Sequence, residues 1–247
     1  MATSVWAGTA VCLFLLMVIV GHLKNVTACS CLPQHTQHHF CNSHFVIKAR
    51  IKSEKMLVKK GYDAHNLQKL PLPVLTSAQR SFRLWVREVY KGHQFIAVGS
   101  HPEIVTSYYE SMCGVTDLEV GKTYVIMGLL TDSKLKFTNC NWREPWTQIS
   151  KHQRRGLRYW YEKNCDSCKI DTCGKFSPCG QQEMERVKQG DSCFWDPMND
   201  QCHNLHSSCG RHDGGSCKWF QTHELMTRQN CTRQDRKMPR LNHSLIP

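Results

Sequence analysis

Residues 45–52 read Phe-Val-Ile-Lys-Ala-Arg-Ile-Lys, and this alternation of apolar and basic side chains decides the fold. Successive side chains of a β-strand point to opposite faces, so a period of two predicts a strand with one buried and one solvated face. The residues expected to face the core are Phe45, Ile47, Ala49 and Ile51. Those expected to face solvent are Val46, Lys48, Arg50 and Lys52.

Further strands are expected along the first part of the chain. In residues 82–87, Phe82, Leu84 and Val86 alternate with Arg83, Trp85 and Arg87. A more continuous apolar strand covers 124–130, another follows the turn at 131–133 through Leu135 and Phe137, and a fifth lies near 102–107. The pattern is typical of a mainly β chain.

A helix is expected over 146–161, because Ile149, Gln153 and Leu157 recur at fourfold spacing and Thr147 is a suitable N-cap. The Pro71-Leu-Pro73 segment predicts a loop. Five short strands and a helix predict a small closed barrel of the oligonucleotide/oligosaccharide-binding (OB) type.

The first 28 residues are interpreted as a signal peptide. The apolar run from Thr9 to Val20 is too short to span a bilayer, and Val26-Thr27-Ala28 provides modest or small residues before a cut. Cys29 would then begin a secreted mature chain, expected in the extracellular space or matrix with no membrane span. A membrane anchor is the competing interpretation.

Cysteine spacing predicts two domains. Of 15 cysteines, Cys12 falls in the signal peptide; the others are sparse as far as Cys140 and dense from Cys165 onward. An even number at this density in a secreted chain predicts a disulfide framework. We therefore expect an N-terminal domain over 29–166 and a small disulfide-rich domain over 167–247.

Charge and sequons add less specific expectations. The formal net charge is +12, which favours acidic glycans and anionic surfaces as partners. Asn230-Cys231-Thr232 and Asn242-His243-Ser244 are candidate glycosylation sites. We expect a monomer with no nucleic-acid partner.

No motif predicts an enzyme. His223-Glu-Leu-Met-Thr227 begins like a zinc-protease helix but lacks its second histidine, and Cys165-Asp-Ser-Cys168 is better explained as structural. The histidines at 35, 38, 39 and 44 are irregularly spaced, which favours a solvated loop over a metal site. No Gly-x-Ser-x-Gly or phosphate loop is present.

The motif Cys29-Ser30-Cys31-Leu32-Pro33 has companions that together resemble the tissue inhibitors of metalloproteinases. The resemblance covers nearly all of the mature chain. Its other segments are Phe40-Cys-Asn-Ser43, Val46-Ile-Lys-Ala49, Val89-Tyr-Lys-Gly92, Glu110-Ser-Met-Cys-Gly114, Pro145-Trp146, Gln153-Arg-Arg-Gly156, Cys193-Phe-Trp195 and Cys217-Lys-Trp219.

This resemblance implies a netrin-like OB barrel and six disulfides. The implied pairs are Cys29–Cys113, Cys31–Cys140, Cys41–Cys165, Cys168–Cys217, Cys173–Cys179 and Cys193–Cys209. Cys202 and Cys231 have no counterpart in the usual family pattern. We predict that they form a seventh bridge, with intermolecular pairing as the alternative.

The resemblance also implies a function. A secreted family member would inhibit zinc metalloproteinases, such as matrix metalloproteinases, without a cofactor of its own. The α-amine and carbonyl of Cys29 would chelate the partner's zinc, and Ser30 would enter the pocket beside it. The expected protease-binding residues are Cys29, Ser30, Cys31, Leu32, Pro33, Glu110, Ser111, Met112 and Cys113.

A second class of function stays open. Netrin-like barrels also occur in proteins that bind extracellular matrix without blocking a protease. Here, heparan sulfate could bind the strand faces that carry Lys48, Arg50, Lys52, Arg83 and Arg87. The tail from Asp235 to Arg240 is basic, whereas some family members hold a proenzyme through an acidic tail, so no proenzyme partner is predicted.

Overall fold

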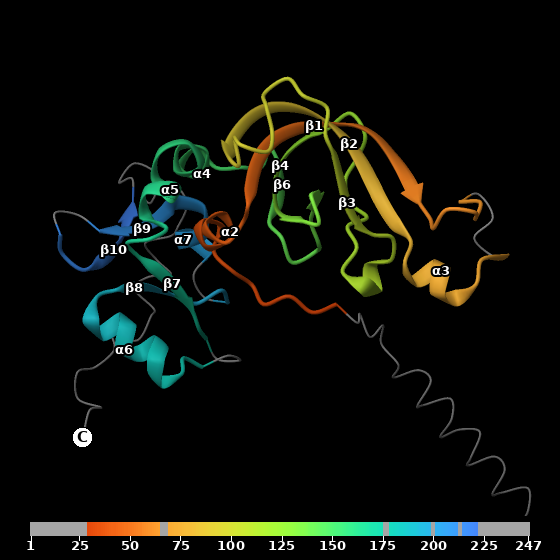
Figure 1. Ribbon diagram of the computed structural model, residues 1–247. Coiled ribbons are helices and arrows are strands. Elements are labelled where there is room, and N and C mark those ends of the chain that lie inside the picture. The colour runs from red at the N-terminus through yellow and green to blue at the C-terminus, as the bar shows by residue number, and fades with distance from the viewer. Residues whose placement is uncertain (1–28, 65–68, 175–177, 199–200, 212–213, 222–247) are drawn as a thin grey trace, which may run out of the picture.

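The computed structural model describes residues 29–64, 69–174, 178–198, 201–211 and 214–221 (Figure 1). The predicted signal peptide, the 223–227 motif, Cys231 and both sequons lie outside the described residues. Within the described part of the chain, no helix is long and apolar enough to cross a membrane.

Five strands form the expected closed barrel. They are β1 (Phe45–Leu57), β2 (Gln79–Lys91), β3 (Glu103–Ser107), β4 (Thr123–Thr131) and β5 (Lys134–Lys136). The order is β1-β2-β3-β5-β4, and β4 pairs back with β1 to close the ring. Only β3 and β5 run parallel among these pairs. The OB-type barrel is confirmed, with one unpredicted strand, β6 (Arg143–Pro145), added beside β4.

The alternation in β1 produces two cores rather than one. The side chains expected inside the barrel are buried there, together with apolar residues of the other strands. Val46, expected to face solvent, is fully buried in a second cluster with Phe40, Met127, Leu157 and Tyr161. The prediction for Val46 was wrong because helices cover this part of the outer face of the barrel.

The predicted helix over 146–161 begins later and is not uniform. The backbone N–H of Trp146 donates to Thr123 O at 2.9 Å, which holds this residue in the turn directly after β6. Ser150, rather than Thr147, caps the helix and forms a capping box with Gln153. The segment then comprises α4 (Lys151–Arg155), a π-helical turn η3 (Gly156–Trp160) and α5 (Tyr161–Asn164).

Two segments expected to be loops are helical. Residues 71–73 open the short helix α3 (Leu72–Thr76), because a proline is tolerated in the first helical turn. The histidine-rich segment forms α2 (Thr36–Cys41), with His35 as its N-cap. The Lys91 ammonium donates to Phe40 O and Cys41 O, which satisfies carbonyls at the end of α2.

The C-terminal part is built from two small sheets. Strand β7 (Lys169–Thr172) runs parallel to β8 (Ser192–Trp195), and β9 (Ser207–Arg211) pairs antiparallel with β10 (Cys217–Gln221). Helices α6 (Gln181–Gln189) and α7 (Gln201–His206) complete it. Its buried cluster consists of four cysteines, Ile170 and Trp195.

The structure contains the six disulfide pairs that the resemblance implies. Cys202 is also disulfide-bonded, but the predicted partner Cys231 lies outside the described residues, so that pairing stays a prediction. The predicted boundary near Asp166 falls between α5 and β7. Figure 1 shows α2 between the barrel and the C-terminal strands, so side chains of α2 contact both parts.

Candidate functional site

Disulfides join two distant segments into one exposed edge. Cys29 is bonded to Cys113 with their Cα atoms 5.1 Å apart, and Cys31 is bonded to Cys140 at 5.2 Å. Residues 29–31 are therefore attached at two points, unlike an ordinary chain terminus. We name residues 29–33 together with 110–113 the binding edge.

Between these anchors, the binding edge presents side chains to solvent. Ser30, Leu32 and Pro33 are exposed, and so are Glu110, Ser111 and Met112. The exposed fraction is 73% for Leu32 and 45% for Met112. A backbone that disulfides already fix loses less conformational freedom when its exposed side chains meet a partner.

The 110–113 side of the edge is a rigid turn. Glu110–Met112 form the 3-10 turn η2, and Cys113 adopts a left-handed conformation with φ of 59°. The Cys113 N–H donates to Glu110 O at 2.9 Å, and its carbonyl accepts from the Asn139 N–H at 2.9 Å. Local and long-range hydrogen bonds therefore hold the unusual backbone angle.

Gly114 permits this turn. Its N–H donates to Tyr109 O at 3.0 Å. A Cβ atom at position 114 would lie 2.6 Å from the same carbonyl oxygen and would also collide with Ser107 O. Only glycine allows the backbone to fold this closely onto the end of β3.

Arg80 on β2 supports the turn from the other side. Its guanidinium lies 4.6 Å from the centre of the Tyr108 ring, donates to Tyr108 O at 3.4 Å and forms an ion pair with Glu54. Sequence analysis did not identify Arg80, Tyr108 or Asn139 as parts of the site. These contacts carry no local sequence signal because they join separate strands and loops.

The sulfur atoms of the edge form no metal site of their own. The sulfurs of Cys29, Cys113 and Cys140 all lie within 4.8 Å of one another, and those of Cys29 and Cys31 are 4.0 Å apart. A metal ligand needs a thiolate, but each of these atoms belongs to a disulfide. Any metal ligand that Cys29 offers must therefore be a backbone atom.

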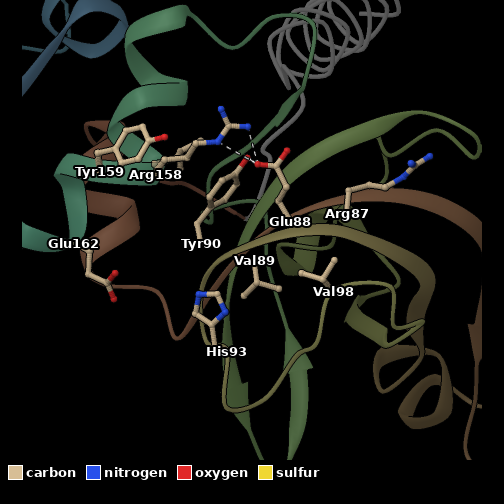
Figure 2. Close-up of a pocket in the computed structure, with 10 residues that line it drawn as sticks. Arg87, Glu88, Val89, Tyr90, His93, Val98, Arg158, Tyr159 and Glu162 are labelled. Carbon is tan, nitrogen blue, oxygen red and sulfur yellow. Dashed lines mark hydrogen bonds and ion pairs between the residues drawn. The ribbon is translucent and has the colours of Figure 1, made fainter.

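A groove of about 420 Å³ lies between the end of β2 and η3. Figure 2 shows its lining residues, which lie outside the binding edge. Glu88 in this groove accepts hydrogen bonds from Lys48, Arg158 and Tyr90. Burial opposes ionisation of Glu88, but the bonds from Lys48 and Arg158 outweigh it and lower its pKa. This carboxylate is committed to ion pairs, so it is poorly suited to proton transfer.

The outer face of β1 and β2 carries an aromatic ring among cations. The Arg87 guanidinium lies 3.6 Å from the centre of the Trp85 ring, and the Lys52 ammonium lies 5.7 Å from it. Arg50 is directly opposite Trp85 in the sheet, while Lys48 is paired with Glu88. The predicted basic face therefore exists, but Lys48 is partly neutralised.

Two motifs weighed from the sequence have structural roles. Cys165 pairs with Cys41 and Cys168 with Cys217, so the 165–168 motif forms no redox disulfide. The expectation of a solvated histidine loop was wrong for His35, His38 and His39, which cap or form α2, whereas His44 is exposed in a bend before β1. His35 is fully buried, and the pKa of His39 is lowered to about 4 by burial and then by His38.

The fold and the exposed edge together indicate the general class of the protein. A closed OB barrel displays a disulfide-fixed, exposed edge, and the groove carboxylate Glu88 is held in ion pairs with Lys48 and Arg158. This combination is typical of a binding protein.

The comparisons identify the family. The family model "Tissue inhibitor of metalloproteinase" matches residues 27–219. Metalloproteinase inhibitor 3 of Scyliorhinus torazame is 32% identical over 223 residues, covering 87% of this chain and 92% of the relative. Metalloproteinase inhibitor 4 of Mus musculus is 31% identical over 203 residues, covering 79% of this chain and 82% of the relative. Metalloproteinase inhibitor 2 of Homo sapiens is 30% identical over 213 residues, covering 83% of this chain and 87% of the relative.

The chain therefore belongs to the tissue inhibitor of metalloproteinase family, and it is not an enzyme.

Proposed function

We propose that this chain is a secreted inhibitor of zinc metalloproteinases and that the backbone of mature Cys29 binds the catalytic zinc of the protease. Membership of the inhibitor family supports the first half of the proposal. The observation that carries the second half is the attachment of Cys29 to Cys113 and of Cys31 to Cys140 beside an exposed turn. These bridges order the edge before it meets a partner, which lowers the entropic cost of binding.

The chemistry requires Cys29 to be the first residue of the mature chain. Its α-amine nitrogen and carbonyl oxygen then form a five-membered chelate ring with a metal ion. A catalytic zinc keeps one coordination position for water, and occupying that position removes the attacking species. The amine must be neutral, which costs little near neutral pH because the reference pKa of an α-amine is about 7.7–8.0.

The neighbouring residues of the binding edge would fit the substrate cleft. Ser30 would point into the pocket beside the zinc, where its size and polarity set selectivity. Leu32 and Pro33 would extend along the cleft. Glu110, Ser111 and Met112 would come alongside, since the Cys29–Cys113 bridge places them next to Cys29.

The test compares two otherwise identical secreted forms, one beginning at Cys29 and one with a single alanine before it. Inhibition constants are measured against the catalytic domain of a matrix metalloproteinase. We expect the extended form to lose inhibition by a factor of about 1,000 or more, because the amide nitrogen it creates is a poor zinc ligand. Equal inhibition by the two forms would refute the chelation mechanism.

Two controls make the comparison specific. Disulfide mapping must show the same bridges in both forms, which excludes misfolding as the cause. N-terminal sequencing of the natural secreted protein must begin at Cys29, which tests the signal cleavage and the extracellular location together.

A second candidate function is binding of heparan sulfate to the face around Trp85. Arg87 and Lys52 flank an aromatic ring, and such a platform suits a sulfated sugar because the ring packs on the sugar while the cations bind sulfate. We expect Trp85→Ala and Arg87→Gln each to lower the salt concentration that elutes the protein from heparin. Lys163→Gln, an exposed substitution on α5, is the matched control. Unchanged elution of both variants would exclude the face around Trp85 as the heparin site. If the form with an added N-terminal alanine still binds heparin, heparin binding is independent of protease inhibition.

A further inference from the structure

Histidines gather where α2 and α4 meet α7 and β9. We name His35, His152, His203 and His206 the histidine seam. His35 precedes α2, His152 lies on α4, and the other two lie on α7. The seam joins the barrel part of the chain to the C-terminal part.

The two ring nitrogens of His35 have fixed and opposite roles. Its Nε2 lies 2.9 Å from His203 O, and its Nδ1 accepts from the Gln37 N–H at 3.1 Å. A backbone carbonyl can only accept and a backbone N–H can only donate, so the single proton sits on Nε2. A second proton on Nδ1 would face the Gln37 N–H and remove the N-cap of α2.

The hydrogen bonds that cross the seam depend on this cap. The backbone N–H and hydroxyl of Thr36 both donate to Asn204 Oδ1 at 2.8 Å. The Gln37 amide exchanges two hydrogen bonds with the Cys209 backbone, at 2.7 and 2.8 Å. The His35 ring itself packs against Trp195 and Trp219, at centroid distances of 5.6 and 5.0 Å. Moving His35 would therefore disturb the whole contact.

His152 and His206 are buried without hydrogen bonds from their rings. Their exposed fractions are 2% and 3%, and among the described residues none of their four ring nitrogens has a hydrogen-bond partner. His152 packs on Trp160 with ring centroids 4.8 Å apart. A proton added to the His152 ring would create a buried charge that only the Ser207 backbone favours, which is unfavourable overall.

The charged groups around the seam do not offset the cost of protonating its buried histidines. Burial lowers the pKa of His152 to about 4, with His206 and Arg155 acting in the same direction and the Ser207 backbone opposing. Burial lowers the pKa of His35 to about 3; the His203 backbone opposes this, while the imidazoles of His203, His152 and His38 reinforce it. No carboxylate is among the groups that act on His35 or His152.

The carboxylate of Asp171 acts on a histidine outside the seam. Asp171 on β7 acts on His38, whose pKa is lowered by burial despite that charge and a bond to the Ile170 backbone. The Asp171 oxygens already accept from Arg186 at 2.6 and 3.2 Å. Asp171 is therefore not available to stabilise a protonated seam.

We propose that the histidine seam is an acid-sensitive latch, which holds α7 and β9 against α2 and α4 only while His35 and His152 are neutral. Acid opens the contact because the histidines can take up protons only when they reach water. The polypeptide chain at Asp166 keeps the two parts attached, next to the Cys41–Cys165 bridge, and the bridges of the binding edge are not affected.

The pH range follows from the sign of the shifts. Above the ordinary histidine pKa of 6.5, the histidines are neutral in both the closed and the open latch, and the latch is closed. As pH falls from 6.5 toward 4 the open state binds protons and the closed state does not, so the equilibrium moves toward opening. Between pH 7.5 and pH 5 each such histidine shifts the equilibrium by about thirtyfold.

Hydrogen exchange of the full disulfide-bonded chain tests the latch. Protection factors, which correct for the intrinsic effect of pH, are measured from pH 7.5 to 4.5 for residues 36–41 and 201–211. We expect protection in both segments to fall together below about pH 6 and to recover on neutralisation, while β1 and β4 stay protected. Unchanged protection of these segments down to pH 4.5 would overturn the proposal.

Variants assign the effect to the seam. His152→Leu removes one titrating group while keeping an apolar side chain, so opening should move to lower pH. His93→Gln and His101→Gln change exposed histidines outside the seam and should leave the transition unchanged. An identical transition in His152→Leu would count against the latch.

A direct measurement on the unaltered protein covers the case in which His152→Leu does not fold. The His35 and His152 ring signals are followed by NMR as pH falls. They should stay neutral until the seam opens. Titration near pH 6.5 with the seam still protected would refute the proposal.

Discussion

Gly114 shows how one residue shapes the binding edge. A Cβ atom there would meet two backbone oxygens, and backbone cannot move aside as a flexible side chain can. We expect Gly114→Ala to lower the free energy of unfolding by about 1–3 kcal/mol, as overpacking typically does. Denaturant unfolding under non-reducing conditions measures this.

Gly180→Ala is the matched control for that substitution. The atom its Cβ would meet is the end of the Glu183 side chain, which can rotate away. We expect a smaller loss, about 0.5 kcal/mol, because alanine is less favoured than glycine at an N-cap but meets no backbone atom here. Equal losses in both variants would mean that the turn at 110–113 is not held by close packing.

A substitution at Ser30 is expected to change protease binding without changing the stability of the fold. It is exposed between two anchored cysteines, so Ser30→Gly should change the free energy of unfolding by less than about 0.5 kcal/mol. If Ser30 enters the pocket beside the zinc, the same change should alter the ranking of target proteases by about tenfold or more. Inhibition constants against several metalloproteinases check this. An unchanged ranking would place Ser30 outside the pocket.

At the scale of elements, the stabilisation from a disulfide is expected to increase with the length of chain that it closes. Cys31–Cys140 closes a separation of 109 residues, whereas Cys173–Cys179 closes only 6. Loop-closure entropy then predicts that replacing both cysteines by serine costs about 5 kcal/mol for the first pair and about 2 kcal/mol for the second. Thermal unfolding measures the order, and only the first variant should also weaken inhibition. The reverse order would show that the bridges do not act mainly through chain entropy.

The elements also show what the sequence can predict. The barrel strands were predictable because alternation in 45–52 and 82–87 reflects burial on one face, which is a local property. The helix predicted to begin at Trp146 begins at Lys151, because a hydrogen bond to distant Thr123 holds Trp146 in the turn after β6. The π-helical turn was not predictable either: its Gly156 has no room for a side chain because the Tyr161 ring packs against it.

The binding edge shows the same division between local and distant information. Its residues were predicted from a resemblance, whereas the contacts of Arg80, Tyr108 and Asn139 that support its turn were not predicted. His35 was misread because partners 168 residues away, Asn204 and His203 among them, bury and bond this segment. Such contacts carry no periodic signal, so only the folded chain reveals them.

At the scale of the whole molecule, the cysteine inventory predicts a closed monomer. The six bridges account for twelve cysteines of the described chain, and Cys202 is bonded as well. If Cys202 pairs with Cys231, the unreduced secreted protein should show no alkylatable thiol and the mass of a single chain. Intact mass with and without alkylation decides this. Two alkylated thiols or a disulfide-linked dimer would contradict the prediction.

The central claim is that the backbone of Cys29 binds the zinc of the protease. A crystal structure of the chain bound to a metalloproteinase catalytic domain measures this directly. The account predicts the Cys29 α-amine nitrogen and carbonyl oxygen within about 2.0–2.2 Å of the zinc, in place of water. A zinc that keeps its water, with no Cys29 backbone atom in its coordination sphere, would contradict it.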